Sequence, residues 1–307
     1  MTGAAATARA VQPAPLPGGA ERRTVSVVMV VYRTGEALAQ SLACVVADPH
    51  VDQFIVVDNG SSPGEEARLA DLARDPKVVV VSGQGNVGFA RGANLGAAKA
   101  TGDLLVFLNP DAFLEPGCIT ALADEVEAHP GLCLVGGRIL NADRSEQRGG
   151  RRGEVTPLRA LLSISGLSRA GALRRFEVHH ETAALPDAAV ATPTVSGALF
   201  CMRRGDFAAL GGFDEGYFLH VEDIDLCWRV RRAGGEVLFH PKAEVVHIGG
   251  TSRSSPIKVE FHKGVGLARY FMKRAGNPAE WLAALVVSPL VLAAAVARPV
   301  LWKLRGG

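Results

Sequence analysis

Four acidic positions in the sequence carry side chains suited to binding a cation or removing a proton. They are Asp58, Asp103, Asp111 and an acidic cluster made of the adjacent pair Glu222–Asp223 with Asp225 two residues on. A diphosphate leaving group needs a hard divalent cation with oxygen ligands to neutralise the charge that develops on it. An attacking hydroxyl needs a positioned general base. One such residue alone could be a helix cap or a turn residue, but we expect the set to converge on one edge of the fold.

A histidine adds a candidate nitrogen ligand to this group. His247 follows a short apolar segment and precedes Gly249 and Gly250. Imidazole suits transition metals such as Mn²⁺ better than it suits Mg²⁺. A single histidine is more often structural than a metal ligand, so its position alone leaves both interpretations of His247 open.

A glycine pattern supports a competing interpretation. Residues 83–88 match G-x-G-x-x-G after an apolar run and before a helical segment, with Asp103 downstream, which is typical of a dinucleotide site. That fingerprint belongs to the first strand-to-helix turn of a sheet, and its acidic residue ends a strand. Here the match follows the third apolar run, and Asp103 begins the fourth. A dinucleotide-dependent oxidoreductase stays as an alternative, and glycine-rich backbone can approach a phosphate or ribose in either case.

These residues must be held by the elements around them. Apolar, β-branched runs alternate with segments of helical spacing through the first half of the chain. We expect strands at 25–31, 54–57, 78–81, 104–108 and 132–140, and helices at 35–46, 65–73, 89–100 and 116–129. Such alternation predicts an α/β domain with an open parallel sheet and helices on both faces. Ligands bind beyond the carboxyl ends of such strands, which places Asp58, Asn86 and Asp111 on one rim.

The second half of the chain is less regular. Residues 141–193 are rich in Arg and Gly, and we interpret them as a long, partly ordered excursion. Leu158, Leu161 and Leu162 follow helical spacing, so this segment could rest on an anionic membrane surface or form a solvated loop with a short packed helix. Its arginines include Arg152, Arg159, Arg169, Arg174 and Arg175. Regular structure is expected again at 194–202, with a helix at 222–233 and short strands at 237–239 and 244–247.

Composition limits the class of protein. With 307 residues, 48% of them hydrophobic, the chain can form one large α/β domain or two small ones. A formal net charge of +2 gives no global field that would attract nucleic acid. The five cysteines are scattered and form no C-x-x-C pair, which argues against a disulfide framework or zinc site and favours a reducing cytosol.

The two ends of the chain differ. Residues 1–22 are rich in Ala, Pro and Gly and lack the basic start and apolar core of a signal peptide, so we interpret them as a disordered tail. Residues 281–297 contain no charged residue and would form a helix of about 25 Å, slightly short of the roughly 30 Å bilayer core and interrupted by Pro289. We expect residues 276–307 to lie in or dip into the cytoplasmic leaflet. A buried helix or a homo-oligomer interface is the alternative.

Six motifs follow one another along residues 24–274. They are VSVVMVVY ending at Tyr32, VVDNGS around Asp58, GNVGFARGANLG over 85–96, LNPD ending at Asp111, GGFDE at 211–215 and FLHVEDIDLCWR ending at Arg229. Together they resemble glycosyltransferase family 2, whose members have the GT-A fold. The Asn-Pro-Asp form and the EDIDLCWR stretch most resemble bacterial rhamnosyltransferases of cell-wall and O-antigen assembly.

The resemblance implies a donor site at the carboxyl ends of the first strands. Tyr32 would pack near the donor base, and Asp58 would accept a hydrogen bond from the pyrimidine ring nitrogen. Further residues would line the donor site or stabilise charge at its diphosphate and at the neighbouring acidic cluster. These are Asn86, Arg91, Asn94 and Arg229.

The resemblance also assigns the catalytic and metal-binding residues. Asp223 would be the general base on the acceptor hydroxyl, oriented by Glu222. Asp111 would hold Mg²⁺ or Mn²⁺ through the donor diphosphate. Many relatives carry Asp-x-Asp here, whereas this chain has Asn109 at the first position, so His247 would compensate as a ligand.

On this resemblance, the chain is an inverting, metal-dependent transferase at the cytoplasmic face of the membrane, with a catalytic domain over residues 23–275. The expected donor is dTDP-L-rhamnose, and the expected acceptor is a polyprenyl-diphosphate-linked saccharide. Other donors, UDP-galactofuranose or a UDP-hexose, stay open, as does a non-catalytic relative that binds a membrane lipid or a partner.

Overall fold

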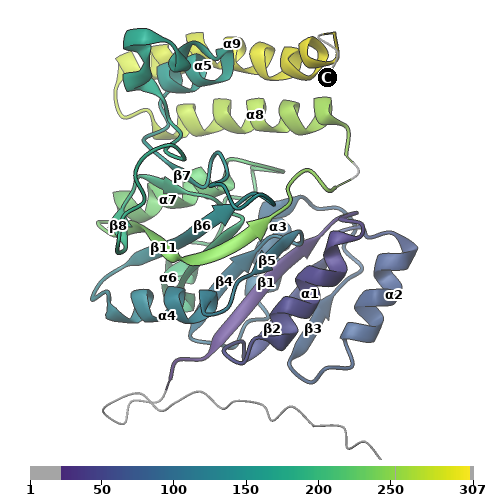
Figure 1. Cartoon of the computed structure of the whole chain (residues 1–307). Helices are drawn as coiled ribbons and strands as arrows, with labels where there is room; N and C mark the ends of the chain where they lie inside the picture. The colour runs from purple at the N-terminus through teal and green to yellow at the C-terminus, as the bar shows by residue number, and fades with distance from the viewer. Residues whose placement is uncertain (1–21, 253, 305–307) are drawn as a thin grey trace, which may run out of the picture.

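A computed structural model describes residues 22–252 and 254–304, so the expected tail lies outside the described residues except for Arg22. The chain forms one mixed nine-stranded sheet with helices on both faces and a helical layer at one end (Figure 1). The strands are β1 (Val25–Val31), β2 (Gln53–Asp58), β3 (Val78–Val81), β4 (Leu104–Leu108), β5 (Ala112–Leu114), β6 (Cys133–Leu140), β7 (Arg151–Arg152), β8 (Val190–Ala191), β9 (Thr194–Val195), β10 (Leu199–Arg203) and β11 (Glu236–His247), of which β7 and β9 form a separate pair. The helices are α1 (Ala37–Ala47), α2 (Pro63–Leu72), α3 (Phe89–Ala97), α4 (Cys118–Ala128), α5 (Pro157–Ser165), α6 (Arg204–Ala209), α7 (Glu222–Arg232), α8 (Pro256–Arg274) and α9 (Pro278–Leu304), with short 3-10 helices η1 (Leu167–Arg169) and η2 (Gly171–Phe176).

The first half of the sheet is parallel, as the sequence pattern predicts. β1 lies between β2 and β4 and pairs with both in parallel, and β3 extends the sheet beyond β2. All side chains of β1 are buried, as expected for a strand covered on both faces. α1 and α4 contribute to the core on one face, and α3 and α7 contribute to the core on the other. Parallel pairing brings the ends of β1, β2, β3 and β4 to one edge of the sheet.

The second half of the sheet departs from the expected parallel arrangement. β10 lies between β4 and β6 and pairs antiparallel with both, and β5 pairs antiparallel with β11. The apolar run of a buried strand does not encode its direction, so the sequence pattern could not reveal this difference. The two short strands expected at 237–239 and 244–247 form one strand, β11, with an irregularity between His240 and Glu244. Pro241, which has no N–H to donate, lies at this irregularity.

Residues 141–193 are more ordered than the sequence led us to expect. β7 pairs antiparallel with β9, which attaches this segment to the body of the domain. α5 follows Thr156, whose side chain accepts a hydrogen bond from the Arg159 N–H, and it ends at Gly166 in a left-handed conformation. The expected excursion is therefore a folded insertion.

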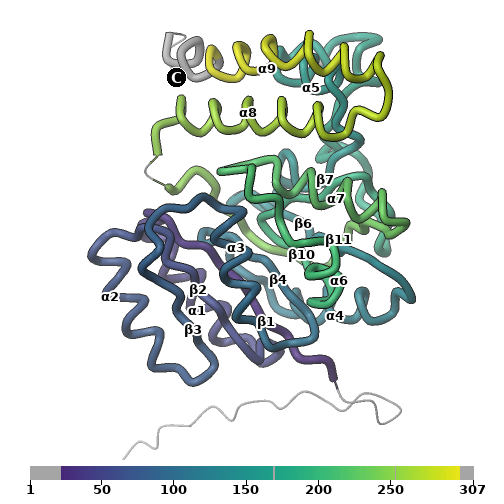
Figure 2. The backbone as a smooth tube through the Cα atoms, turned by 180° about the vertical axis from the view of Figure 1, so that it is seen from behind, coloured from purple at the N-terminus to yellow at the C-terminus, as the bar shows by residue number. Residues whose placement is uncertain are grey.

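A helical layer covers one end of the domain (Figures 1 and 2). α8, which has no counterpart among the expected elements, lies nearest the sheet, and α9 packs on both α8 and α5. α9 continues through Pro289, so the expected interruption does not occur. Among the described residues, α9 is the one helix that is both long enough and apolar enough to cross a membrane. Only 22% of its most apolar 18-residue stretch is buried.

Candidate active site

The end of β2 forms one wall of the site. The Asp58 carboxylate accepts hydrogen bonds through Oδ1 from the N–H groups of Gly60 at 3.1 Å and Ser61 at 2.8 Å, which fixes the turn that leaves the strand. Beside Asp58 lies a pocket of about 450 Å³ between α2 and the end of β3. Its other walls are Glu66, Leu69, Ala70, Ala73, Val80, Ser82 and Gly83. A carboxylate at the side of a pocket with both apolar and polar walls is suited to a planar base with a ring N–H.

Asn86 and Tyr32 lie against the same turn. Asn86 accepts a hydrogen bond from the Asn59 side chain at 3.1 Å. The Tyr32 ring packs next to Gly60, where a Cβ atom would lie 3.4 Å from Cε2 of Tyr32 and 3.8 Å from Cβ of Asn86. The structure therefore brings Tyr32, Asp58 and Asn86 together at the sheet edge, although they come from the ends of different strands.

The glycine-rich turn at residues 83–88 leads from β3 into α3. β3 is the edge strand of the sheet, whereas a dinucleotide fingerprint follows the first, central strand. Gly83, Gly85 and Gly88 all have positive φ angles, so the glycines shape the turn itself. The oxidoreductase alternative therefore finds no support in the position of this motif.

Two residues of α3 face the loop before α7. The Asn94 side chain makes two hydrogen bonds with the backbone of Phe213. Nδ2 donates to the carbonyl and Oδ1 accepts from the N–H, each at 2.9 Å. Asn94 therefore anchors this loop, and the expectation that it lines the donor site is not supported. Arg91 forms an exposed ion pair with Glu215 at 3.8 Å and points to the same loop.

Asp111 and His247 form a close pair across the sheet edge. Oδ1 of Asp111 lies 3.1 Å from Nε2 of His247. On the other side of the imidazole, Nδ1 lies 2.7 Å from Oε1 of Gln147, which can only accept a hydrogen bond. Nδ1 therefore carries the proton, and Nε2 is directed at Asp111 and at the amide of Asn109, 3.2 Å away.

This pair fits part of a divalent cation site. A carboxylate oxygen and an imidazole nitrogen are both ligands that Mn²⁺ accepts. Burial opposes ionisation of Asp111, but the hydrogen bond and the positive charge that His247 supplies when it is protonated, together with the Thr251 hydroxyl, outweigh it and lower the pKa of Asp111. Among residues 22–252 and 254–304, no three His, Cys, Asp or Glu side chains are grouped to hold an ion. Further ligands would have to come from substrate and water.

The Glu222–Asp223 pair opens α7 after a strained turn. His220 and Val221, the two residues before it, have φ angles of 66° and 76°. Left-handed backbone in residues other than glycine is costly and persists only where the surrounding structure imposes it. The start of α7 is thus held in place by contacts outside the helix.

Asp223 is connected to the Asp111 loop through two consecutive residues. Gly197 donates its N–H to Oδ2 of Asp223 at 3.0 Å. The next residue, Ala198, accepts a hydrogen bond through its carbonyl from the N–H of Asn109 at 3.0 Å. These contacts bring the acidic pair of α7 and the Asp111–His247 pair to one edge, as expected.

Asp223 also has an ion-pair partner that the sequence did not indicate. Arg152 donates through Nη2 to Oδ2 of Asp223 at 2.5 Å and to the Val195 carbonyl at 3.1 Å. The two charged side chains are only 15% and 14% exposed. Neither of the two interpretations left open for its segment placed Arg152 against Asp223; the pairing of β7 with β9 turns it inward. No local signal marks Arg152, since its partner lies 71 residues away.

The two acids of the pair differ in charge. Burial and the neighbouring charge of Asp223 raise the pKa of Glu222. Burial also opposes the charge on Asp223, but the Arg152 charge and the Gly197 N–H outweigh it and hold the pKa of Asp223 below its ordinary value. The hydrogen bonds described for Asp223 come from Arg152, Gly197 and Ile224 rather than from Glu222. We expected Glu222 to orient Asp223, but in the structure Arg152 and the backbone orient it.

Arg229 donates to Oδ2 of Asp225 at 2.7 Å and to the Leu210 carbonyl at 2.8 Å, so it pairs with the third acid of the expected cluster and also supports the loop before α7. The expectation for Asp103 is wrong. Asp103 accepts hydrogen bonds from the backbone and side chain of Thr24, both at 3.1 Å, where β1 and β4 begin. Asp103 therefore lies at the opposite end of the strands from the site.

Comparisons with known sequences agree with this geometry. The family model described as "Glycosyl transferase family 2" matches residues 26–184, more than half of the chain. An N-acetylglucosaminyl-diphospho-decaprenol L-rhamnosyltransferase of Mycobacterium tuberculosis is 28% identical over 72% of this chain and 75% of its own length. Rhamnosyltransferase WbbL of Escherichia coli K12 is 27% identical over 73% of this chain and 83% of its own.

Solved structures share the architecture. Mannosyltransferase PcManGT from Pyrobaculum calidifontis, in complex with GDP-Man and Mn²⁺, has a TM-score of 0.57 at 19% identity over 92% of this chain and 75% of that one. GalNAc-T7 with UDP, GalNAc and Mn²⁺ has a TM-score of 0.56 at 17% identity, covering 87% of this chain and 54% of its own. Identities this low show the fold alone, and the expected GT-A fold is confirmed.

Proposed function

The chain belongs to glycosyl transferase family 2, and we propose that it transfers L-rhamnose, with inversion, from dTDP-L-rhamnose to a polyprenyl-diphosphate-linked saccharide. The observation that carries this proposal is the position of an oriented Asp223 at the same sheet edge as the Asp111–His247 pair, to which it is linked through Gly197 and Ala198. The sugar and the lipid-linked acceptor are supported by the Mycobacterium tuberculosis relative, whose name specifies L-rhamnose and N-acetylglucosaminyl-diphospho-decaprenol.

Asp223 would act as the general base. Its carboxylate takes the proton of the acceptor hydroxyl while the hydroxyl oxygen attacks the anomeric carbon of the donor. The bond from that carbon to the phosphate oxygen breaks on the opposite side, and the nucleoside diphosphate leaves with the electron pair. One displacement of this kind inverts the anomeric configuration without a covalent intermediate on the enzyme. Arg152 and Gly197 hold the carboxylate in place for this transfer.

The donor would lie along the strand ends. Its base would enter the pocket beside Asp58, and its diphosphate would lie near Asp111 and His247. These two side chains would hold Mg²⁺ or Mn²⁺, which neutralises the charge of a leaving diphosphate. Asn109 contributes no negative charge, so His247 would supply the second protein ligand beside the single carboxylate.

The acceptor's lipid would place the enzyme at the cytoplasmic face of the membrane. α9 presents an apolar outer face, and α5 lies beside it with Leu158 exposed. The exposed residues of α9 include Trp281, Leu282, Leu285, Val286 and Leu290. A contiguous apolar surface of this kind marks a site of interaction with a membrane or another protein. A lipid-linked acceptor cannot leave the bilayer, which favours the membrane.

A donor screen tests the proposed reaction. Purified full-length protein with Mn²⁺ and a polyprenyl-diphosphate-linked saccharide is given dTDP-L-rhamnose, UDP-galactofuranose, UDP-glucose or GDP-mannose. We expect transfer from dTDP-L-rhamnose and a product of inverted configuration by NMR. A preference for another donor would contradict only the sugar, whereas a retained configuration would contradict the single displacement.

Vesicle binding tests the proposed location. The double variant Leu282→Ser, Val286→Ser changes two side chains of α9 that are 62% and 57% exposed, so it leaves the packing of the helix intact. We expect the wild-type protein to co-sediment with anionic phospholipid vesicles and the variant to stay in solution. A wild-type protein that ignores vesicles and forms a dimer that the variant lacks would assign this face to an oligomer interface.

A further inference from the structure

Residues 212–221, called the approach segment, lead into α7 and are fixed on one side by α3. Asn94 bonds both backbone atoms of Phe213, and Phe89 donates its N–H to the Phe218 carbonyl at 2.8 Å. At Gly88 a Cβ atom would lie 2.6 Å from that carbonyl oxygen, so the two backbones touch. α3 therefore holds the approach segment at two points, Phe213 and Phe218.

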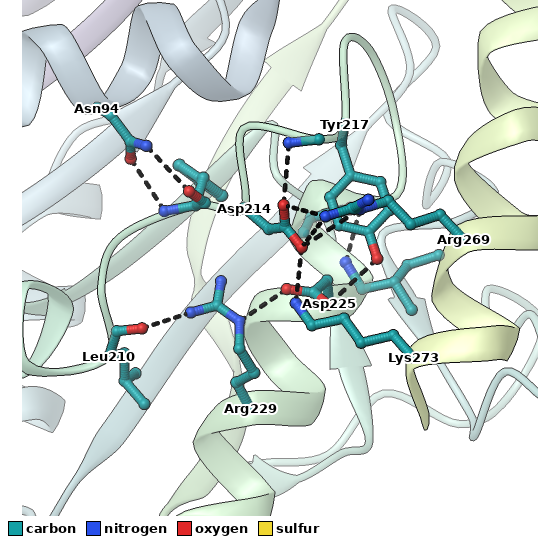
Figure 3. A network of polar contacts seen from close by, with 12 residues as sticks. Asn94, Leu210, Asp214, Tyr217, Asp225, Arg229, Arg269 and Lys273 are labelled. Carbon is teal, nitrogen blue, oxygen red and sulfur yellow. Dashed lines mark hydrogen bonds and ion pairs between the residues drawn. The ribbon is translucent and has the colours of Figure 1, made fainter. Parts of the chain in front are cut away.

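On the other side, the approach segment is held by charged residues of α8 (Figure 3). Asp214 accepts hydrogen bonds from Nη2 of Arg269 at 2.9 Å and from Nζ of Lys273 at 2.8 Å. Lys273 also lies 2.8 Å from Oδ1 of Asp225, whose side chain is fully buried on α7. One lysine of α8 thus joins the approach segment to the helix that carries Asp223.

α8 also touches the strained turn directly. At Gly266 a Cβ atom would lie 3.0 Å from Cγ2 of Val221 and 3.2 Å from the carbonyl oxygen of His220. These are the two residues with left-handed backbone that immediately precede Glu222–Asp223. Such a conformation needs support from its neighbours. The backbone of α8 at Gly266 is the neighbour that covers this turn.

The opposite side of α8 carries α9. Gly264 is two residues before Gly266 and therefore points away from it on the helix. A Cβ atom at Gly264 would lie 2.7 Å from Cδ1 of Leu292 and 3.1 Å from its Cα. α8 is thus in close contact with the turn before Asp223 on one side and with the apolar layer on the other.

We propose that α8 is a positioning element of the active site, in which Gly266, Arg269 and Lys273 set the place of Asp223 relative to the bound acceptor. The inference rests on the proposed role of Asp223 as the general base. None of these residues need touch substrate, since each acts through the approach segment or through Asp225. The C-terminal region is then part of the catalytic machinery and not a detachable anchor.

Lys273→Met is the variant that tests this role with the least damage. When the Lys273 ammonium group is removed, Asp225 still pairs with Arg229 at 2.7 Å and accepts a hydrogen bond from Tyr217. Asp214 still pairs with Arg269. No buried carboxylate is left without a partner, so we expect the variant to fold. Lys258→Met, on an exposed position of the same helix, is the matched control.

The experiment measures kcat and the donor KM with a short soluble acceptor and no membrane. We expect Lys273→Met to lower kcat about tenfold, a change equivalent to 1.4 kcal/mol, with a donor KM within about twofold of the wild type. Lys273→Arg should recover part of kcat, because it restores a cation between Asp214 and Asp225. Gly266→Ala should lower kcat in the same way, with Gly205→Ala as its control, because a Cβ at Gly205 meets nothing within 4 Å.

The outcomes separate this inference from the proposed function. If Asp223→Asn is inactive but Lys273→Met and Gly266→Ala keep the kcat of the wild type, the positioning role is wrong and the base assignment stands. If Lys273→Met loses kcat only in proportion to its loss of folded protein, or if its donor KM rises as much as kcat falls, α8 is merely structural. An active Asp223→Asn enzyme would overturn both.

Discussion

The part of the site around Asp58, proposed to bind the donor and called the donor half, and the part around Asp223, proposed to activate the acceptor and called the acceptor half, are built from contacts of different reach. In the donor half, Asp58 binds N–H groups two and three residues further along the chain. In the acceptor half, Arg152 reaches Asp223 over 71 residues, and Asn94 reaches Phe213 over 119. The repeating strand-to-helix units shape the donor half, whereas the acceptor half exists only once the insertion and the C-terminal helices have folded against α7.

This difference suggests what each half controls. The donor half presents a preformed pocket beside Asp58 and should govern donor affinity. The acceptor half places one carboxylate through an arginine, a backbone N–H and a strained turn, so it should govern turnover. Substitutions in the donor half should therefore change mainly the donor KM, and substitutions in the acceptor half should change mainly kcat.

The largest effect is expected where the two halves meet, at Asp111 and His247. EDTA should abolish transfer, and Mn²⁺ or Mg²⁺ should restore it. Asp111→Ala removes the charged ligand and should raise the Mn²⁺ concentration for half-maximal activity about 100-fold, with a smaller rise for His247→Ala. Titration of activity with Mn²⁺ measures both. Full activity in EDTA would mean that arginine or lysine side chains neutralise the diphosphate instead.

The next effect is expected in the acceptor half, at the base itself. Asp223→Asn should lower kcat by a factor of about 100 or more, because the amide cannot take the hydroxyl proton. The donor KM should change little, since Asp223 lies outside the donor pocket. Steady-state kinetics checks both values, with Asp124→Asn on the exposed face of α4 as the control. A variant with near wild-type kcat would remove Asp223 from the mechanism.

Arg152 should show a smaller effect with a distinctive dependence on pH. Arg152 holds the pKa of Asp223 below its ordinary value, so activity in the wild type is lost only as pH falls through that low pKa. Arg152→Gln removes the charge and should raise the pKa of Asp223, which moves the acid limb of kcat to higher pH. We also expect kcat at neutral pH to fall about tenfold, from loss of orientation.

The control for Arg152 comes from the same insertion. Arg159→Gln also removes one positive charge, but the hydrogen bond described for the Arg159 side chain goes to the Glu154 carbonyl at 3.5 Å and not to Asp223. Its pH profile should match that of the wild type. An acid limb that stays in place for Arg152→Gln would show that the ion pair does not set the ionisation of the base.

The smallest effect is expected in the donor half. Asp58→Asn keeps an oxygen for the turn but loses the charge that would receive a ring N–H. We expect the donor KM to rise about tenfold, the value of one hydrogen bond to a charged group, with kcat nearly unchanged. Asp71→Asn, on the exposed side of α2, is the control. A fall in kcat with an unchanged KM would contradict the division of labour between the halves.

Much of the donor half could be predicted from the sequence. β1 and β4 begin and end where the apolar runs do, because a strand buried on both faces must be apolar along its length. β3 also matches its apolar run, although it is a partly exposed edge strand. The parallel alternation of strands and helices then places Asp58 and Asn86 on one rim without further information. The family resemblance suggested that His247 acts beside Asp111. No local pattern in the sequence indicated the geometry of this pair.

In the acceptor half, the sequence motif singled out the proposed base but not all of its supports. Arg152 was grouped with the arginines of a segment that could rest on a membrane or form a solvated loop, and its pairing with Asp223 was not predicted. The partner of such a side chain is chosen by packing, and several carboxylates in the chain were equally plausible partners. Asp103 was misplaced for a simpler reason, since a residue that begins a strand cannot share an edge with one that ends it.

The sequence by itself determined the class of fold, the strand ends that carry polar side chains and the residue proposed as the base. These follow from local patterns, because burial on two faces and short-range turn geometry act on neighbouring residues. The tertiary structure alone decided the antiparallel β10, the close contact of α8 with the turn before Asp223 and the ion pair of Arg152 with Asp223. Their energies depend on excluding water between segments far apart in the chain, and no local pattern records which segments will meet.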